Sequence, residues 1–140
     1  EDENLKKIAE ENNVRLTLIP NLNHSELMNL YKKYKYFISS STFEGNPKTI
    51  LEAMSSGCIV LASNIPNHKE IIVSEFKKDK VCGFLFDLQP TNLLNLFQEL
   101  INQDEKLTEI SNNARESVNQ LNSLENIGLL TYKDYVNLKS

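Results

Sequence analysis

A continuous apolar run at residues 58–62 (CIVLA) lies between two segments whose apolar residues recur at helical spacing. Such a run is typical of a strand buried on both faces, as in a parallel sheet that is covered by helices. Residues 36–39 and 83–86 are predicted to form further short strands. Because strands and helices alternate at intervals of roughly 20 residues, the pattern predicts an α/β fold with a Rossmann-like parallel sheet flanked by helices.

Residues that begin or end helices support this alternation. Asn23 or Ser25 is expected to cap one helix, and Pro47 is expected at the first position of the next. Gly57 is expected to end that second helix, because glycine readily adopts the left-handed conformation that follows a helix.

The segments before and after this central region have their own patterns. Leu5 and Ala9 are spaced as on one face of a helix, and residues 14–19 (VRLTLI) alternate and are predicted to be a strand. Beyond the central strand we expect a turn at residues 65–68 and a short helix at residues 69–73.

Residues 91–139 are predicted to be helical, so residues 91–140 form the C-terminal helices of one domain that spans residues 1–140. Two apolar stripes mark these helices. They consist of Leu93, Leu94, Phe97, Leu100 and Ile101, and of Leu107, Ile110, Ala114 and Val118.

Composition excludes several classes of protein. With 40% hydrophobic and 24% charged residues the chain is not of a disordered type, and its net charge of −4 argues against a surface that grips nucleic acid. Cys58 and Cys82 lie in apolar runs without metal-ligand spacing, so we expect both to be reduced and buried, as in the cytosol. No apolar stretch reaches the length of about 18 residues that a membrane span needs.

The polar loop at residues 40–46 is the predicted place for chemistry, because ligands of parallel sheets bind beyond the carboxyl ends of the strands. Glu44 lies in this loop, and Glu52 lies in the following helix, where its side chain leans back toward the helix start. Gly45 allows the backbone to approach a ligand, and the first-turn amides of the helix favour a phosphate.

Carboxylates accept hydrogen bonds from sugar hydroxyls, so this arrangement fits a nucleoside diphosphate sugar. The alternative is a purely structural one. Two glutamates eight positions apart also occur by chance, and Gly-x-Pro before a helix is often only a turn.

Residues 40–47 (SSTFEGNP), 52–54 (EAM) and 57–60 (GCIV) resemble the C-terminal motif of the family-4 retaining glycosyltransferases of the GT-B fold. Their pattern is Pro-Ser-x-x-Glu-Gly-x-Pro, a Glu-Ala-Met helix, and Gly-x-Pro-Val-Val. Residues 64–72 (NIPNHKEII) and 81–86 (VCGFLF) are similar to the family's next turn and strand. The resemblance implies a nucleotide-sugar-binding domain, the partial C-terminal domain of a GT-B enzyme.

Carried over by position, the resemblance implies that Glu52 binds the ribose hydroxyls. Glu44 is implied to contact the donor sugar and is the residue assigned to catalysis. Neither a cofactor nor a metal is expected, and the leaving diphosphate is expected to help deprotonate the acceptor. The residues implied to line the sugar and phosphate side are Gly45, Asn46, Pro47, Lys48 and Thr49.

The sequence also departs from the family pattern. Asn67 replaces the turn glycine, and asparagine tolerates the left-handed region better than most residues. No segment matches the family's Gly-Arg loop and Arg/Lys pair, so the chain is expected to be truncated at its N-terminal side. The first two strand–helix units and the acceptor domain would then be missing, and the isolated chain would have little or no activity. Residues 14–19 are expected to pair with residues 36–39 or to form an exposed edge.

The resulting function is transfer of a glycosyl group, with retention, from a nucleoside diphosphate sugar to a saccharide or lipid-linked acceptor. Polysaccharide biosynthesis, in the cytoplasm or at the inner face of the membrane, is the implied setting. The alternatives are a nucleotide-sugar epimerase of the same fold and a non-catalytic binding or assembly domain. A receiver-like signalling domain is disfavoured, because no Asp ends a predicted strand beside an acidic cluster.

Three polar residues near the predicted site have two interpretations each. His68 is expected to line a turn, with contact to a phosphate or sugar as the alternative. Glu70 either caps its helix or faces the nucleotide, and Lys48 is either solvated or bound to a phosphate.

Overall fold

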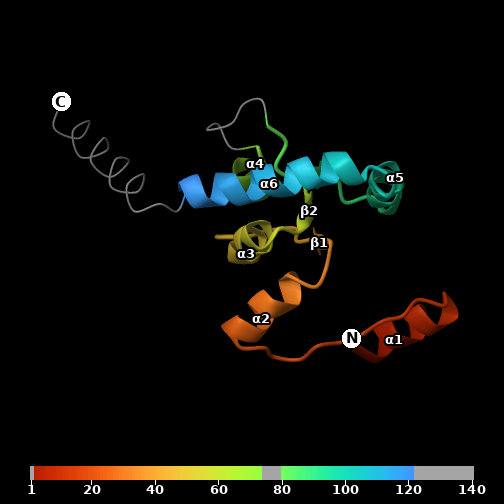
Figure 1. The fold of residues 1–140 in the computed structure, drawn as a ribbon. Coiled ribbons are helices and arrows are strands. Elements are labelled where there is room, and N and C mark those ends of the chain that lie inside the picture. The colour runs from red at the N-terminus through yellow and green to blue at the C-terminus, as the bar shows by residue number, and fades with distance from the viewer. Residues whose placement is uncertain (1, 74–79, 122–140) are drawn as a thin grey trace, which may run out of the picture.

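The computed structural model describes residues 2–73 and 80–121 of the chain, which form an α/β domain (Figure 1). The part of the predicted C-terminal helices beyond residue 121 lies outside the described residues. The elements are α1 (Asp2–Glu11), α2 (His24–Tyr31), β1 (Tyr36–Ser39), α3 (Lys48–Ser56), β2 (Ile59–Ser63), α4 (Pro66–Ile72), β3 (Phe84–Phe86), α5 (Pro90–Leu100) and α6 (Asp104–Leu121).

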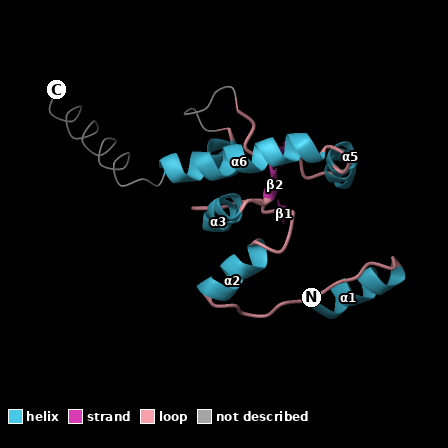
Figure 2. Ribbon diagram, in the orientation of Figure 1, coloured by secondary structure: helices cyan, strands magenta, loops and turns pink. Residues whose placement is uncertain are grey.

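The three described strands form one parallel sheet in the order β1-β2-β3, with helices packed around it (Figure 2). Phe37 of β1 pairs with Val60, and Ala62 of β2 pairs with Leu85. Every residue of the central strand β2 is buried, as the apolar run predicts. The predicted α/β architecture is confirmed.

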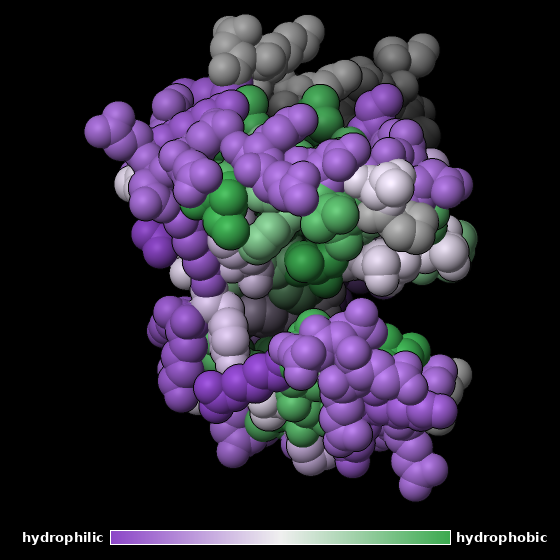
Figure 3. Space-filling view, turned by 90° about the vertical axis from the view of Figure 1, so that its right-hand side faces the viewer, coloured by the Kyte–Doolittle hydropathy of each residue, from purple (hydrophilic) through white to green (hydrophobic). Residues whose placement is uncertain are grey.

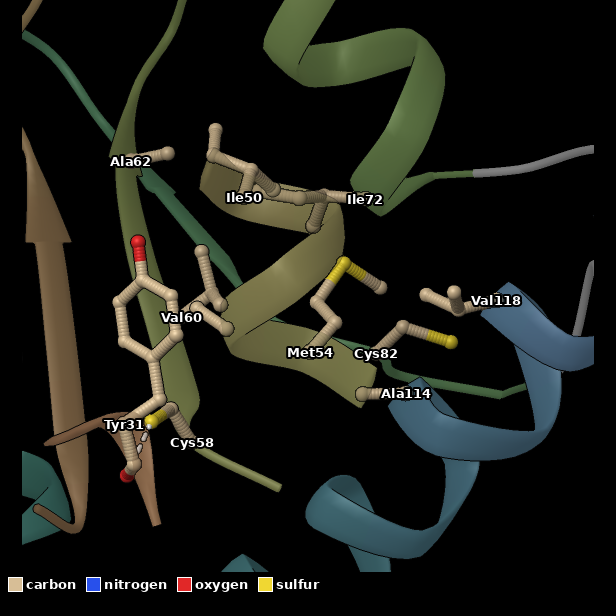
Figure 4. Close-up of a cluster of buried hydrophobic side chains, with 11 residues drawn as sticks. Tyr31, Ile50, Met54, Cys58, Val60, Ala62, Ile72, Cys82, Ala114 and Val118 are labelled. Atoms are coloured by element: carbon tan, nitrogen blue, oxygen red, sulfur yellow. Dashed lines mark hydrogen bonds between the residues drawn. The ribbon is translucent and has the colours of Figure 1, made fainter. Parts of the chain in front are cut away.

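Two apolar cores lie on opposite faces of β2, because successive side chains of a strand point to opposite faces. Val60 and Ala62 face α3 and belong to one core with Ile50 and Met54 of that helix (Figure 4). Ile59 and Leu61 face the other way, toward α5 and the first part of α6. The first core consists of Tyr31, Ile50, Ala53, Met54, Cys58, Val60, Ala62, Ile72, Cys82, Ala114 and Val118. The second consists of Ile59, Leu61, Phe86, Leu100, Leu107 and Ile110.

Helix termini agree with the sequence in most places. Asn23 and Glu26 form a capping box at the start of α2, and Gly57 ends α3 with a φ of 91° in the left-handed region. Pro47 is the N-cap of α3 rather than its first helical residue. The prediction was off by one position, because the ring fixes φ but leaves ψ free to place proline just outside the helix.

The turn predicted at residues 65–68 is wrong, because α4 already begins at Pro66. Proline is well suited to a first helical turn, and this extends the helix toward the strand. Asn67 lies inside this helix and not in a left-handed turn. Within residues 2–73 and 80–121, Asn13 is the one non-glycine residue with a positive φ, 53°.

Residues 14–19 were predicted to be a strand, and this prediction is wrong. They are not part of the sheet, and each of them is exposed. They follow α1, which the sequence predicted correctly and whose one buried residue is Ala9 (Figure 1). In Figure 3, a hollow with apolar surface separates the lower part of the molecule, which lies at the height of α1, from the upper part. A β-rich segment forms a strand only when a neighbour accepts its hydrogen bonds, and the described chain supplies none here.

The two apolar stripes predicted for the C-terminal helices differ in how far their residues are buried. Leu107, Ile110, Ala114 and Val118 of α6 are all buried, as predicted. In contrast, Leu94 and Ile101 are 56% and 52% exposed, because the helix breaks at residues 101–103 and only one side of α5 meets β3. Both cysteines are free thiols and buried, as expected. None of the described helices has the length and apolar character needed to cross a membrane.

Candidate functional site

The loop between β1 and α3 is held in place through its serine and glutamate side chains. The Ser41 hydroxyl donates a hydrogen bond of 2.7 Å to Oε1 of Glu44, which is half-buried. The carbonyl oxygen of Ser41 accepts a hydrogen bond of 2.5 Å from the hydroxyl of Ser63, at the carboxyl end of β2. The Glu44 carboxylate is therefore held in a defined orientation at the carboxyl edge of the sheet.

The start of α3 is open to an anion. Within the described residues no side chain caps this end of the helix, and its first turn contains no acidic residue. Lys48 and Thr49 of this turn are exposed, whereas Pro47 is buried and fixes the approach of the chain. The amides of Lys48 and Ile50 already donate to the Asn46 and Pro47 carbonyls, so the positive end of the helix dipole is what favours a phosphate or carboxylate at this place.

Glu52 lies farther along α3, on the side that faces α2. Its Oε1 is 3.5 Å from Nδ1 of His24, and its side chain is 25% exposed. Burial raises the pKa of Tyr31, and the negative charge of Glu52 raises that pKa further. Glu44 and Glu52 thus have separate neighbours, one in its own loop and one in α2, and their convergence on one ligand stays a prediction.

A shallow pocket of about 240 Å³ opens beside Gly45. A Cβ atom placed at Gly45 would meet no atom within 4 Å, so the backbone is accessible from this side. The side-chain amide of Asn67 donates a hydrogen bond of 2.9 Å to the Gly45 carbonyl and so connects α4 to the loop. The pocket is lined by Gly45, Asn46, Pro47, Leu51, Asn67, Glu70 and Ile71.

His68 is fully buried rather than part of an exposed turn, so the expectation of a turn-lining residue is wrong. Its Nδ1 lies 3.0 Å from the Ser63 carbonyl oxygen and 3.2 Å from the Ser63 hydroxyl. The start of α4 at Pro66 causes this, because it turns the side chain at position 68 inward. The sequence reasoning also missed Ser63, whose one signal is a polar residue at the end of an apolar strand.

A second cavity, of about 420 Å³, lies at the opposite end of the sheet, before β1 and β2. Lys35 and Asp104 form an exposed ion pair there, and the hydrogen bond that Lys35 donates to the Asp104 carboxylate raises the pKa of Lys35. Arg115 also lines this cavity. Because the cavity is at the amino ends of the strands, it is separate from the loop that carries Glu44. Within residues 2–73 and 80–121, no group of three or more His, Cys, Asp or Glu side chains is placed to hold a metal ion.

The fold and the loop together define the class of this domain. It is a parallel α/β domain with a carboxylate-bearing loop and an open helix start at the carboxyl edge of its sheet, the place where such sheets bind ligands. Residues 1–117 match the family of glycosyl transferases group 1, and the chain belongs to this family.

Two curated relatives are similar over most of the chain. The Xenopus tropicalis "Glycosyltransferase 1 domain-containing protein 1" is 33% identical over 108 residues, which cover 77% of this chain and 30% of that protein. The Escherichia coli UDP-Gal:alpha-D-GlcNAc-diphosphoundecaprenol alpha-1,3-galactosyltransferase is 31% identical over 117 residues, or 84% of this chain and 27% of the relative. The chain thus spans less than a third of the length of either relative.

Solved structures share the fold. Sucrose-phosphate synthase from Thermosynechococcus elongatus superposes with a TM-score of 0.74 at 23% identity, over 97% of this chain and 34% of that one. Anabaena HepE in complex with UDP and glucose has a TM-score of 0.71 at 20% identity, over 97% and 35%. TarM has a TM-score of 0.72 at 22% identity, over 97% and 26%. The fold is therefore that of GT-B glycosyltransferases.

Proposed function

We propose that this chain is the donor-binding half of a retaining glycosyltransferase. It would bind a nucleoside diphosphate sugar, whose glycosyl group is transferred to a saccharide or lipid-linked acceptor. The observation that carries the proposal is the loop at residues 40–47, which presents an oriented Glu44 directly before the uncapped start of α3. Family membership supports the reaction class.

Each part of the donor has a proposed partner. Glu52 binds the ribose hydroxyls, because an ionised carboxylate accepts a hydrogen bond from each of two neighbouring hydroxyls. Glu44 binds the donor sugar and acts at the catalytic centre. The backbone from Gly45 to Thr49 and the side chain of Lys48 face the sugar and the diphosphate. The aimed amide dipoles would stabilise the charge that develops on the leaving diphosphate.

Uracil is the base to test first. The name of the E. coli relative specifies a UDP-galactose donor, and the Anabaena structure contains UDP and glucose. The E. coli name also specifies a lipid-linked acceptor, which agrees with action in the cytoplasm at the inner face of a membrane and with polysaccharide biosynthesis.

Calorimetric titration of the chain with UDP, UDP-glucose and UDP-galactose tests donor binding. We expect the Glu44→Gln variant to bind UDP as the original chain does and to bind the UDP-sugars about tenfold more weakly, the effect of losing one charged hydrogen bond. If neither these ligands nor nucleoside diphosphates of other bases raise the melting temperature at millimolar concentration, the alternative of a non-catalytic binding or assembly domain is favoured.

Transfer needs an acceptor site, and we propose that it lies elsewhere in a longer protein, because the chain spans less than a third of its curated relatives. Donor turnover is expected only when this chain is extended to the length of those relatives. The anomeric configuration of the product, read by NMR, tests retention. Conversion of the donor sugar without any acceptor would indicate the epimerase alternative.

A further inference from the structure

Four polar groups from three elements form a chain of hydrogen bonds behind Glu44. Nδ1 of His68 contacts Ser63, the Ser63 hydroxyl donates to the Ser41 carbonyl, and the Ser41 hydroxyl donates to Glu44. His68 and Ser63 are both 0% exposed. The chain therefore begins in the protein interior and ends at a half-buried carboxylate in the candidate site.

The direction of each hydrogen bond follows from the available protons. The Ser63 carbonyl is only an acceptor, and it lies 3.0 Å from Nδ1 of His68, so Nδ1 must carry the proton. The single Ser63 hydroxyl proton points to the Ser41 carbonyl, which also only accepts. The Ser41 hydroxyl is then free to donate to the Glu44 carboxylate. Each proton of these hydrogen bonds is therefore donated either to the Glu44 carboxylate or to a backbone carbonyl oxygen.

The other nitrogen of His68 makes this arrangement unusual. Within the described residues, Nε2 is buried and has no hydrogen-bond partner. A buried polar atom without a partner destabilises the folded state, and an apolar side chain would avoid that cost. Any stabilisation that His68 provides must therefore come from Nδ1, which holds Ser63 in place.

We propose that Ser63 and His68 are positioning residues for donor recognition. They hold the backbone of Ser41, and through its hydroxyl the carboxylate of Glu44, in the orientation that meets the donor sugar. This inference rests on the proposed function, since it assigns Glu44 to the sugar. Neither Ser63 nor His68 touches the donor itself.

Two pairs of variants separate positioning from general stability. Ser63→Ala removes the bond to Ser41, and Ser117→Ala is its control, because Ser117 is equally inaccessible in α6 and its hydroxyl is without a partner among the described residues. His68→Asn keeps an amide donor at the place of Nδ1, whereas His68→Leu removes it. All four variants are compared at a temperature where each is folded.

The first measurement is amide hydrogen exchange at residues 41–46, which needs no ligand. Ser63→Ala and His68→Leu are expected to accelerate exchange in this loop by about three- to tenfold, as for one lost hydrogen bond, and Ser117→Ala and His68→Asn are not. Unchanged exchange in Ser63→Ala would overturn the proposal, whatever the ligand results.

The second measurement is the ratio of the dissociation constants for UDP and a UDP-hexose. Glu44→Gln sets the value of this ratio without the charged sugar contact. We expect Ser63→Ala and His68→Leu to move the ratio toward that value while UDP affinity stays within about twofold, and His68→Asn to restore it. If Glu44→Gln lowers the ratio and Ser63→Ala does not, the positioning role is wrong. If Glu44→Gln itself leaves the ratio unchanged, the proposed function fails, and the inference fails with it.

Discussion

Nδ1 of His24, the first residue of α2, lies 3.5 Å from Oε1 of Glu52 in α3. The contact joins two helices that enclose the first core, next to the buried ring of Tyr31. His24 is 73% exposed, so solvent screens this pair and it contributes little to stability. The Glu52 side chain is itself 25% exposed, so its carboxylate is accessible to a ligand.

Glu52→Gln is expected to weaken UDP binding by at least about tenfold, because a neutral amide replaces a carboxylate that accepts hydrogen bonds from the ribose. The loss should be equal for UDP and UDP-sugars, since the ribose is common to both. Calorimetric titration of the variant with each ligand measures this. A loss confined to UDP-sugars would place Glu52 at the sugar instead.

The matched control is His24→Ala, which removes the neighbour of Glu52 and leaves its charge. UDP affinity should change by less than about threefold, and unfolding free energy by less than about 1 kcal/mol, because solvent screens contacts between exposed polar side chains. A tenfold loss of UDP affinity in His24→Ala would mean that the imidazole, and not only the carboxylate, belongs to the binding site.

Both thiols should be unreactive in the folded chain. Burial raises the pKa of Cys58, and its Sγ lies 3.2 Å from the Tyr31 carbonyl oxygen, which accepts its hydrogen bond. Because the thiolate is the reactive species, a raised pKa lowers reactivity at any given pH below it. Titration with a chromogenic disulfide reagent at pH 8 should modify neither Cys58 nor Cys82 before unfolding, and both in denaturant. Fast modification of native Cys58→Ala would show that Cys82 is accessible.

The strands and helices that the sequence predicts correctly are those with local signals. Residues 58–62 are apolar without interruption, and the buried strand β2 lies there with a shift of one residue. Gly57 ends α3 because the required conformation depends on one residue alone. The segment at residues 14–19 failed for the opposite reason, since a strand depends on a partner that sequence alternation does not reveal.

The candidate site divides in the same way. Glu44, Gly45 and the start of α3 are visible in the sequence, because loop, glycine and helix start are adjacent in the chain. The hydrogen bonds that hold this loop in place are not visible in the sequence. Ser63 contacts the Ser41 carbonyl across 22 positions, and His68 turns inward only because α4 begins at Pro66. Long-range hydrogen bonds of buried polar residues have no sequence periodicity.

Gly57→Ala should destabilise the chain by about 1–2 kcal/mol, the cost of a left-handed conformation for a residue with a Cβ. The φ of 91° sets this cost, and the new Cβ would also meet the guanidinium of Arg115. Arg115 is exposed and its side chain is able to move, so strain should dominate. Urea unfolding of Gly57→Ala and of the Gly57→Ala/Arg115→Ala double variant separates the cost of backbone strain from the cost of the collision with Arg115. Equal losses are expected, and recovery in the double variant would assign the cost to the collision.

Leu61→Ala should cost about 2–5 kcal/mol of unfolding free energy, because Leu61 is 0% exposed at the centre of the sheet and its neighbours in α5 and α6 cannot close the void. Leu94→Ala makes the same chemical change at a side chain that is 56% exposed, and should alter stability by less than about 0.5 kcal/mol. Urea unfolding with unchanged m-values tests both. Equal losses of unfolding free energy at the two positions would contradict this description of the second core. They would require Leu94 to be buried against another surface of the molecule.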